Sequence, residues 1–184
     1  DGYDGSAFIT TGRNFPDALA ASPLATANGW PIYLSDPAAG ANTALTATMK
    51  ASGVTRAIVL GGTNVVSEIV ATEIMNTFGS TPIRLSGADR YATAVEVATY
   101  GVNTGLSWDK PAIATGQKFP DALAGGVLQG HTGSVLLLTP TASLYPSVAT
   151  ILAANKATIV EVRILGGTAS VSETVRTAVQ DSLK

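Results

Sequence analysis

The chain has 184 residues, and its 11 Lys and Arg against 13 Asp and Glu give a net charge of −2, a balance that excludes the basic footprint of a nucleic-acid-binding protein. No segment concentrates Lys or Arg, so a charged membrane surface is not an expected partner either. The apolar fraction of 46% excludes a disordered chain, and the absence of cysteine excludes disulfides, zinc–thiolate sites and a cysteine nucleophile.

Short apolar runs alternate with helical patterns along the chain. The runs are apolar on both faces, as buried strands of a parallel sheet are. Between them, apolar residues recur at helical spacing, as over 70–78 and 175–183. Strand, loop and helix in repetition predict an α/β fold with parallel strands and right-handed crossovers. The predicted strands are 7–11, 31–34, 57–60, 82–85, 112–115, 135–138 and 162–165.

Several helix starts are also marked in the sequence. Ser67 and Ser172 occupy the expected N-cap positions of two helices. Pro16 and Pro120 suit the first turn of a helix, where the missing N–H costs nothing. These signals place helices directly after the loops that follow the predicted strands.

Two sequence blocks occur twice in the same order, which indicates an internal duplication. Thr-Gly-Arg-Asn-Phe-Pro-Asp-Ala-Leu-Ala at 11–20 returns in similar form at 115–124. Leu-Gly-Gly-Thr with Val-Ser-Glu at 60–68 returns at 165–173. We therefore expect the equivalent pairs Val70 and Val175, and Phe78 and Leu183, to occupy matching environments. Phe119 and Leu123, in the second copy, are expected to be buried.

The two repeats are not equally complete. Arg-Leu-Ser-Gly-Ala-Asp-Arg-Tyr-Ala-Thr-Ala at 84–94 precedes the second copy, and nothing equivalent precedes the first. The predicted division is an N-terminally incomplete repeat at 1–81 and a complete repeat at 82–184. The first repeat lacks its opening strand and helix, or receives them from elsewhere.

The loops after the predicted strands are the expected site of function, because all strand-to-helix loops of a parallel sheet lie at its carboxyl edge. Their glycines, hydroxyls, amides and few charges suit sugar hydroxyls and polymer backbones. Backbone N–H groups at the helix starts can also hold a phosphate or carboxylate. The candidate residues from these loops are Arg13, Asn14, Gly61, Gly62, Asp89, Arg90, Lys118, Gly166 and Gly167.

A structural role competes with the functional one at most of these positions. Asp17 and Asp121 lie in a first helical turn, where a carboxylate complements the helix dipole. The paired glycines match no complete nucleotide-binding motif and are explained by tight turns. Arg84 or Arg90 pairing with Asp89 is an equally good interpretation of the 84–94 block. The lone His131 is typical of a solvated helix end.

The inventory of catalytic groups is small. One histidine and no cysteine leave few routes to a catalytic triad, and neither Gly-x-Ser-x-Gly nor His-Glu-x-x-His occurs. Asp17 and Asp89 are conceivable as a carboxylate pair for hydrolysis. Because the motif with Asp17 is duplicated, a binding module is the favoured interpretation.

The blocks at 84–94, 15–19 with 119–123, and 60–67 with 165–172 resemble the cell wall-binding repeat 2 family. The resemblance covers nearly the whole chain. It implies three-layer Rossmann-like units with parallel sheets, usually three in tandem with pseudo-threefold packing, on secreted surface proteins of Gram-positive bacteria. Such repeats anchor proteins non-covalently to an anionic secondary cell-wall polymer.

The resemblance predicts a non-catalytic anchoring module with neither cofactor nor metal. Arg13, Arg84, Arg90 and Lys118 are the predicted source of positive charge for a teichoic-acid-like polymer. Further repeats, in cis or in a homo-oligomer, are the other expected partners; nucleic acid and membrane are not. The alternatives are a wall-modifying hydrolase of the N-acetylmuramoyl-L-alanine amidase type and a purely structural surface-layer element.

Overall fold

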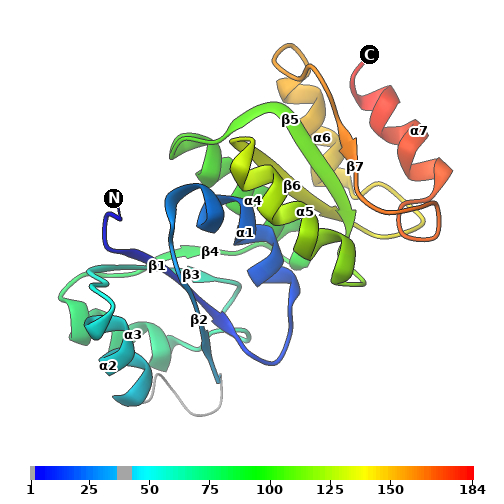
Figure 1. Cartoon of the computed structure of the whole chain (residues 1–184). Helices are drawn as coiled ribbons and strands as arrows, with labels where there is room; N and C mark the ends of the chain where they lie inside the picture. Colours follow the sequence, from blue (N-terminus) through cyan, green and yellow to red (C-terminus); the bar gives the residue numbers. More distant parts are fainter. Residues whose placement is uncertain (1–2, 37–42) are drawn as a thin grey trace.

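Strands and helices alternate along the chain, as the sequence predicts (Figure 1). The computed structural model describes residues 3–36 and 43–184, and residues 1–2 and 37–42 of the first predicted repeat lie outside this description. The strands are β1 Ser6–Thr11, β2 Ile32–Ser35, β3 Arg56–Leu60, β4 Ile83–Leu85, β5 Ser107–Thr115, β6 Ser134–Thr139 and β7 Arg163–Ile164. The helices are α1 Pro16–Asn28, α2 Thr43–Ala51, α3 Glu68–Phe78, α4 Arg90–Asn103, α5 Pro120–His131, α6 Pro146–Asn155 and α7 Glu173–Ser182.

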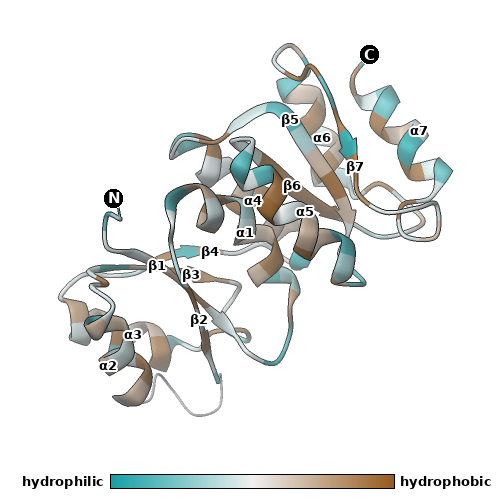
Figure 2. Cartoon of the chain, viewed as in Figure 1, coloured by the Kyte–Doolittle hydropathy of each residue, from teal (hydrophilic) through white to brown (hydrophobic). Residues whose placement is uncertain are grey.

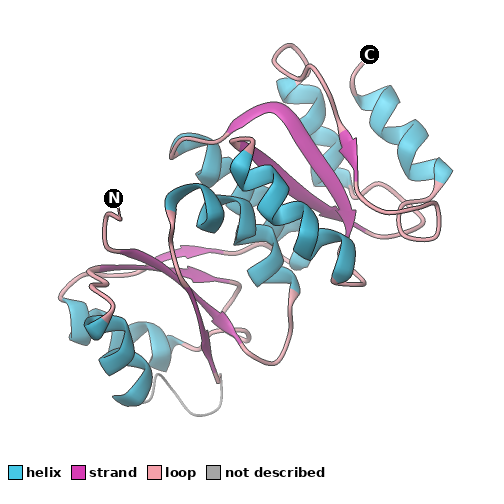
Figure 3. Ribbon diagram, in the orientation of Figure 1, coloured by secondary structure: helices cyan, strands magenta, loops and turns pink. Residues whose placement is uncertain are grey.

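The strands form two parallel sheets with helices between and outside them (Figure 3). The first sheet has the order β2-β1-β3-β4 and the second the order β6-β5-β7. In both sheets the strand that precedes the Phe-Pro-Asp-Ala-Leu motif, β1 or β5, lies between the next two strands of the chain. The α/β fold with parallel, tandemly repeated units is therefore confirmed.

The block at 84–94 is divided between the two sheets. Its strand β4 pairs with β3 of the first sheet, with Ile58 beside Ile83 and Leu60 beside Leu85. Its helix α4 packs against β6 of the second sheet and against α1. The sheet that contains β1, β2 and β3 has four strands because the block at 84–94 supplies β4 at its edge. The sequence boundary between 81 and 82 remains a prediction about the repeats and does not separate the sheets.

The central strands β1 and β3 of the first sheet are buried on both faces, which explains why most of their residues are apolar. Ala7 and Ile9 face a cluster that includes Val70 and Ile74 of α3. Phe8, between them, faces a second cluster shared with α1, α4, α5 and the second sheet. In that sheet β6 is hydrophobic along most of its length (Figure 2). One core thus joins the two sheets, with the helices as intervening layers.

The helix starts follow the sequence signals. The hydroxyls of Ser67 and Ser172 accept from the N–H groups of Val70 and Val175, at 3.5 and 3.3 Å. Pro16 and Pro120 occupy the first turns of α1 and α5. The equivalent helices α3 and α7 also have matching environments, since Val70 and Val175 are fully buried and Phe78 and Leu183 pack half-buried on the core.

The expected burial of Phe119 and Leu123 is wrong. Both lie on the outer face of α5, with 52% and 54% of their surface exposed. They belong to an exposed apolar face of that helix, here named the α5 stripe, which consists of Phe119, Leu123, Val127 and Leu128. The reason is positional: α1 is packed among α4, α5 and β6, whereas no element of the described chain covers the stripe.

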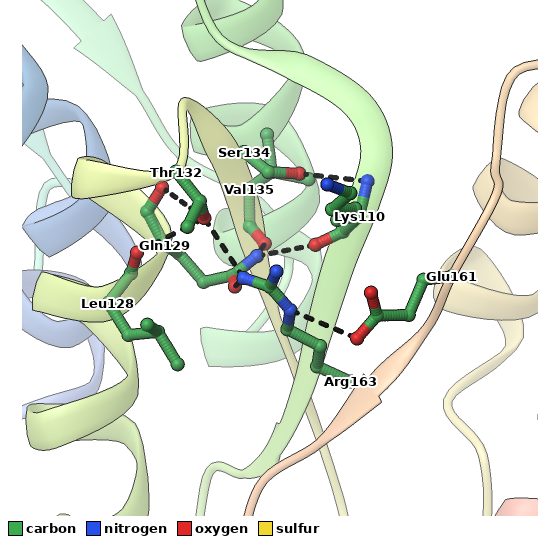
Figure 4. A network of polar contacts seen from close by, with 8 residues as sticks. All are labelled: Lys110, Leu128, Gln129, Thr132, Ser134, Val135, Glu161 and Arg163. Carbon is green, nitrogen blue, oxygen red and sulfur yellow. Dashed lines mark hydrogen bonds and ion pairs between the residues drawn. The ribbon is translucent and has the colours of Figure 1, made fainter.

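The amino ends of the second-sheet strands are held by a polar network around Gln129, a fully buried residue of α5 (Figure 4). Its amide nitrogen donates to the carbonyls of Lys110 and Val135, at 2.7 and 2.9 Å. Its amide oxygen accepts from the guanidinium of Arg163 at 2.9 Å, and Arg163 also contacts Glu161. Because all these polar groups have partners, the network fixes α5 on its sheet at the end opposite the strand-to-helix loops.

Candidate functional site

A cavity of about 410 Å³ lies at the carboxyl ends of β1, β3 and β4. Three loops line it, as the carboxyl-edge argument predicts. Two come from the first repeat, after β1 and β3, and the third is the loop of the 84–94 block after β4. The lining residues are Asn14, Pro16, Asp17, Gly61, Gly62, Thr63, Asn64, Val65, Gly87, Ala88, Asp89, Arg90 and Thr93. The cavity is therefore completed by both repeats.

Gly61 and Asp17 lie next to each other in the lining of this cavity. The backbone of Gly61 has a φ of +93°, and a Cβ there would lie 2.7 Å from Oδ2 of Asp17. Only glycine therefore fits beside the carboxyl group. Burial raises the pKa of Asp17, and the positive charge of Arg90 acts in the opposite direction. The cavity thus contains a carboxyl group that ionises less readily than an exposed aspartate.

The third loop is shaped by hydrogen bonds at the start of α4. The carboxylate of Asp89 accepts from the N–H groups of Tyr91 and Ala92, at 2.9 and 3.0 Å. The N–H of Gly87 donates to the hydroxyl of Thr93 at 3.0 Å. Any side chain at Gly87 would collide with the backbone of Ala92 and Thr93, so glycine is required for the close approach. These contacts turn the loop toward the cavity.

Arg90 connects the cavity to the second sheet. Its guanidinium donates to the carbonyl of Gly116 at 2.7 Å, while the residue also lines the cavity. The adjacent Tyr91 packs on Tyr145, with ring centroids 5.0 Å apart. A hydrogen bond to Asp89 raises the pKa of the Tyr145 hydroxyl. The hydrogen bond to the loop after β5 therefore holds the positive charge of Arg90 in place.

Five of the predicted site residues meet at this cavity: Asn14, Gly61, Gly62, Asp89 and Arg90. Asp89 caps α4, Arg90 binds a carbonyl and Arg84 pairs with Glu68, so the ion pairs of Asp89 with Arg84 or Arg90 considered from the sequence do not form. The amide oxygen of Asn14 accepts from the N–H of Phe15 at 3.0 Å.

The other predicted residues lie elsewhere. Arg13 lies beside the cavity, with an exposed side chain 2.8 Å from Asp36. Arg84 donates to the carbonyls of Gly61 and Val66 and pairs with Glu68 at 3.0 Å, so its charge serves the junction of β4 with α3. The residues of the second repeat, Lys118, Gly166 and Gly167, belong to the other sheet's loops, and Lys118 is exposed.

The second repeat has only part of an equivalent cavity. Pro120, Asp121, Leu165 and Gly166 line an open depression at the carboxyl end of β7. Gly166 has a φ of +95°, and Asp121 lies beside it as Asp17 lies beside Gly61. Within the described chain, no loop equivalent to 87–93 covers this depression. The comparison shows that the first cavity depends on the loop after β4.

The candidate residues chosen from the sequence do not include Thr63, Asn64, Gly87 and Thr93, which also line the cavity. For Asp17 the sequence predicted either a role at the helix dipole or a carboxylate pair with Asp89, and its position one residue after Pro16 gave no sign of the loop after β4. The repeated Phe-Pro-Asp-Ala-Leu motif was the available signal for Asp17. Gly87 and Thr93 line the cavity because β4 pairs with β3, and no local feature of the sequence indicates that pairing.

The lining is suited to a ligand that carries both neutral polar groups and an anionic group. Asn14, Thr63, Asn64 and Thr93 offer amide and hydroxyl groups, as sugar hydroxyls require, and Arg90 offers one cation. Among residues 3–36 and 43–184, no group of three or more His, Cys, Asp or Glu side chains is arranged to hold a metal ion. No helix in the same ranges combines the length and apolar character needed to cross a membrane.

The family model for cell wall binding domain 2 (CWB2) matches residues 2–71 and 84–176, and so covers most of the chain in two segments. The chain belongs to the CWB2 family. It is therefore a cell wall binding module built from repeated α/β units, and the resemblance seen in the sequence motifs is confirmed. The gap between the two matched segments, residues 72–83, runs from within α3 to the first residue of β4.

Two curated relatives of this CWB2 chain come from Bacillus subtilis (strain 168). The N-acetylmuramoyl-L-alanine amidase LytC is 29% identical over 174 residues, which are 95% of this chain and 33% of the relative. The amidase enhancer is 31% identical over 179 residues, which are 97% of this chain and 23% of the relative. The chain thus spans a third or less of each.

Two solved structures share the fold. Cwp6 from Clostridium difficile gives a TM-score of 0.85 at 22% identity, over 96% of this chain and 27% of that protein. Cwp8 from the same organism gives a TM-score of 0.77 at 24% identity, over 99% of this chain and 30% of that protein. In both, the matched CWB2 fold is a minor part of a longer chain.

Proposed function

We propose that this CWB2 chain is a non-covalent anchoring module that binds an anionic secondary polymer of a Gram-positive cell wall. The cavity shared by the two repeats supports this proposal most directly. Its polar lining suits a glycan backbone, and Arg90 provides a positive charge for a phosphate or carboxylate of the polymer. The protein that carries this module is accordingly secreted and held at the cell surface.

Within this proposal, the ten residues chosen from sequence have different roles. Asn14, Gly61, Gly62, Asp89 and Arg90 form the central site. Arg13 and Lys118 add positive charge at its rim or on the neighbouring repeat, although the salt bridge with Asp36 reduces the contribution of Arg13. Arg84, Gly166 and Gly167 act indirectly, by shaping the loops of the two sheets.

We further infer that the chain contributes binding and not catalysis. The amidase name belongs to a relative of which this chain spans one third. Asp17 and Asp89, the conceivable carboxylate pair, both line the cavity, but the carboxylate of Asp89 is engaged in capping α4. Purified peptidoglycan incubated with the chain should release no products, and release of soluble muropeptides or free peptides would contradict this inference.

Co-sedimentation with purified cell walls tests the anchoring function. The parent chain should sediment with intact walls and remain in solution with walls stripped of secondary polymer by acid. Asn14→Ala/Asn64→Ala removes two side chains from the cavity and should weaken binding about tenfold at an unchanged melting temperature. Gln117→Ala, on an exposed loop of the second repeat, is the matched control and should bind as the parent does. Equal binding to stripped walls would refute the proposal.

The α5 stripe is the proposed contact for a further CWB2 repeat. In the existing contact, Phe15 meets Phe119 with ring centroids 5.8 Å apart, and Gly126 and Gly130 of α5 let Ser22, Pro23 and Thr26 of α1 approach closely. The equivalent stripe on α1, which includes Leu19 and Leu24, is buried among α4, α5 and β6. A third helix of this kind, in cis or from another copy, would cover the α5 stripe by a similar head-to-tail contact.

Sedimentation velocity at increasing protein concentration tests this contact between copies. The parent should associate, and Leu123→Glu should remain monomeric because it places a charge in the α5 stripe. Gln117→Glu adds the same charge outside the stripe and should leave association unchanged. Identical sedimentation of parent and Leu123→Glu at every concentration would argue against this use of the stripe.

A further inference from the structure

The free edge of the second sheet has a groove. Strand β7 is paired with β5 on one side, and in the described chain no strand follows it on the other. Between β7 and α7 lies a cavity of about 430 Å³, lined by residues that include Val160, Ile164, Glu173, Arg176 and Gln180. Val160 at its end is 75% exposed, so the groove opens to solvent.

In the first sheet the equivalent space is filled by β4. There Thr81, Pro82 and Arg84 lie against Ala71 and Met75 of α3, and only about 130 Å³ remains. The filling strand also receives a backbone hydrogen bond, because the N–H of Gly61 donates to the carbonyl of Leu85 at 2.9 Å. Gly166, the equivalent of Gly61, ends the open edge of β7. The groove is thus the unfilled counterpart of the place that β4 occupies.

A guanidinium group occupies the same three acceptors in both repeats. In the first, Arg84 of β4 donates to the carbonyls of Gly61 and Val66, at 2.9 and 3.0 Å, and pairs with Glu68. In the second, Arg176 of α7 donates to the equivalent carbonyls of Gly166 and Val171, both at 3.2 Å. Arg176 also lies 3.6 Å from Glu173, the equivalent of Glu68.

The two arginines come from different places in the chain. The residue equivalent to Arg176 in the first repeat is Ala71, which borders the space that Arg84 enters. Where β4 supplies the arginine, the helix has a small residue; where no strand is present, the helix supplies the arginine itself. The longer contacts of Arg176 and its weaker ion pair make it the more replaceable of the two.

We propose that the groove between β7 and α7 is a docking surface for an extended strand of the β4 type, contributed by a further CWB2 repeat. The strand pairs in parallel with β7, and its arginine replaces Arg176 at the carbonyls of Gly166 and Val171 and at Glu173. The docked strand completes the second sheet as β4 completes the first. This inference rests on the proposed association with a further repeat and specifies where its opening strand attaches.

Binding of a labelled peptide to the intact chain tests the proposal. The peptide copies residues 80–89, and fluorescence anisotropy reports its binding. The parent chain should bind it weakly, and Arg176→Ala should bind it about tenfold more tightly, because the acceptors are then free for the peptide's arginine. Arg176→Gln is a second variant with the same expectation. Lys184→Ala also removes a cation near the C-terminus but should leave the affinity unchanged.

Two further variants establish the location. A peptide with alanine in place of its arginine should bind about tenfold more weakly to Arg176→Ala. Gln180→Trp fills the groove and should abolish binding. Undiminished binding by Gln180→Trp would overturn the proposal, since the peptide would then be exchanging with β4 in the first sheet. Absence of binding to the parent and to both folded Arg176 variants would overturn it as well.

This experiment is independent of wall binding. The peptide assay contains no cell wall, so its failure leaves the co-sedimentation result unaffected. Conversely, a chain that binds the peptide and ignores intact walls supports the docking surface and contradicts the anchoring function.

Discussion

Helices α1 and α5 begin with the same Phe-Pro-Asp-Ala-Leu sequence but have opposite environments. Leu19 of α1 is 5% exposed, whereas the equivalent Leu123 of α5 is 54% exposed. Helix α1 lies among α4, α5 and the second sheet, whereas the described chain leaves about half of each side chain on the equivalent face of α5 exposed. The motif therefore specifies a face that contacts the next repeat, and burial depends on whether that repeat is present.

The contact between these helices is adapted on the α5 side. A Cβ on Gly126 or Gly130 would collide with Ser22 or Thr26 of α1, so the two glycines allow close approach of the helix axes. Each glycine inside a helix destabilises the helix by about 1 kcal/mol relative to alanine. The network of Gln129 stabilises α5 at the end where α1 has only Ala25. Equivalent helices thus reach stability through different contacts.

The largest expected effect separates the two leucines. Leu19→Ala should reduce the free energy of unfolding by about 2–5 kcal/mol, because it leaves a cavity in the shared core. Leu123→Ala removes the same atoms from the α5 stripe and should cost less than about 1 kcal/mol. Urea denaturation of the monomeric chain measures both. Equal losses would mean that the α5 stripe is covered in solution.

The second-largest expected effect is the contribution of the Gln129 network to stability, because α5 has no helix over its outer face. Gln129→Ala should destabilise the chain by about 1–3 kcal/mol, since it leaves the carbonyls of Lys110 and Val135 without their donor. Gln117→Ala makes the same change on an exposed loop and should stay within about 0.5 kcal/mol of the parent. If both variants unfold at the same urea concentration, the network contributes nothing to this difference between the helices.

Much of the fold can be predicted from the sequence because its signals are local. Runs that are apolar on both faces predicted the strands. The helix starts were indicated by Ser67, Ser172, Pro16 and Pro120. The assignment of β4 to the first sheet was beyond this reasoning. Which neighbour a short strand joins is decided by long-range packing, here by the contacts of Arg84 with Gly61 and Val66.

The sequence predicted that the candidate site lies at the carboxyl edge of a sheet, but it did not predict which residues make up the site. Asn14, Gly61 and Gly62 were identified because they follow strands of one sheet. Lys118 and Gly166 follow strands of the other sheet, and the sequence repeat gave no means to separate the two edges. The structural role of Arg84 was also hidden, because its acceptors are backbone carbonyls that carry no sequence signature.

The smallest expected effect compares the two aspartates of the repeated motif and depends on pH. Burial raises the pKa of Asp17 above its ordinary value of 3.8, with Arg90 opposing the rise. Between 3.8 and the raised pKa, the folded chain therefore binds more protons than the unfolded chain. The contribution of Asp17 to the free energy of unfolding accordingly increases as the pH falls from neutrality through this window.

Asp17→Asn should remove this contribution, because an amide does not titrate. Asp121→Asn makes the same change at the equivalent position of the second repeat and retains Asp17, so it should keep the parent's rise. Urea denaturation at a series of pH values below neutrality measures the difference between the two variants. A stability difference between the parent and Asp17→Asn that is constant with pH, or grows as the pH rises, would show that burial of Asp17 does not disfavour the ionised carboxyl group.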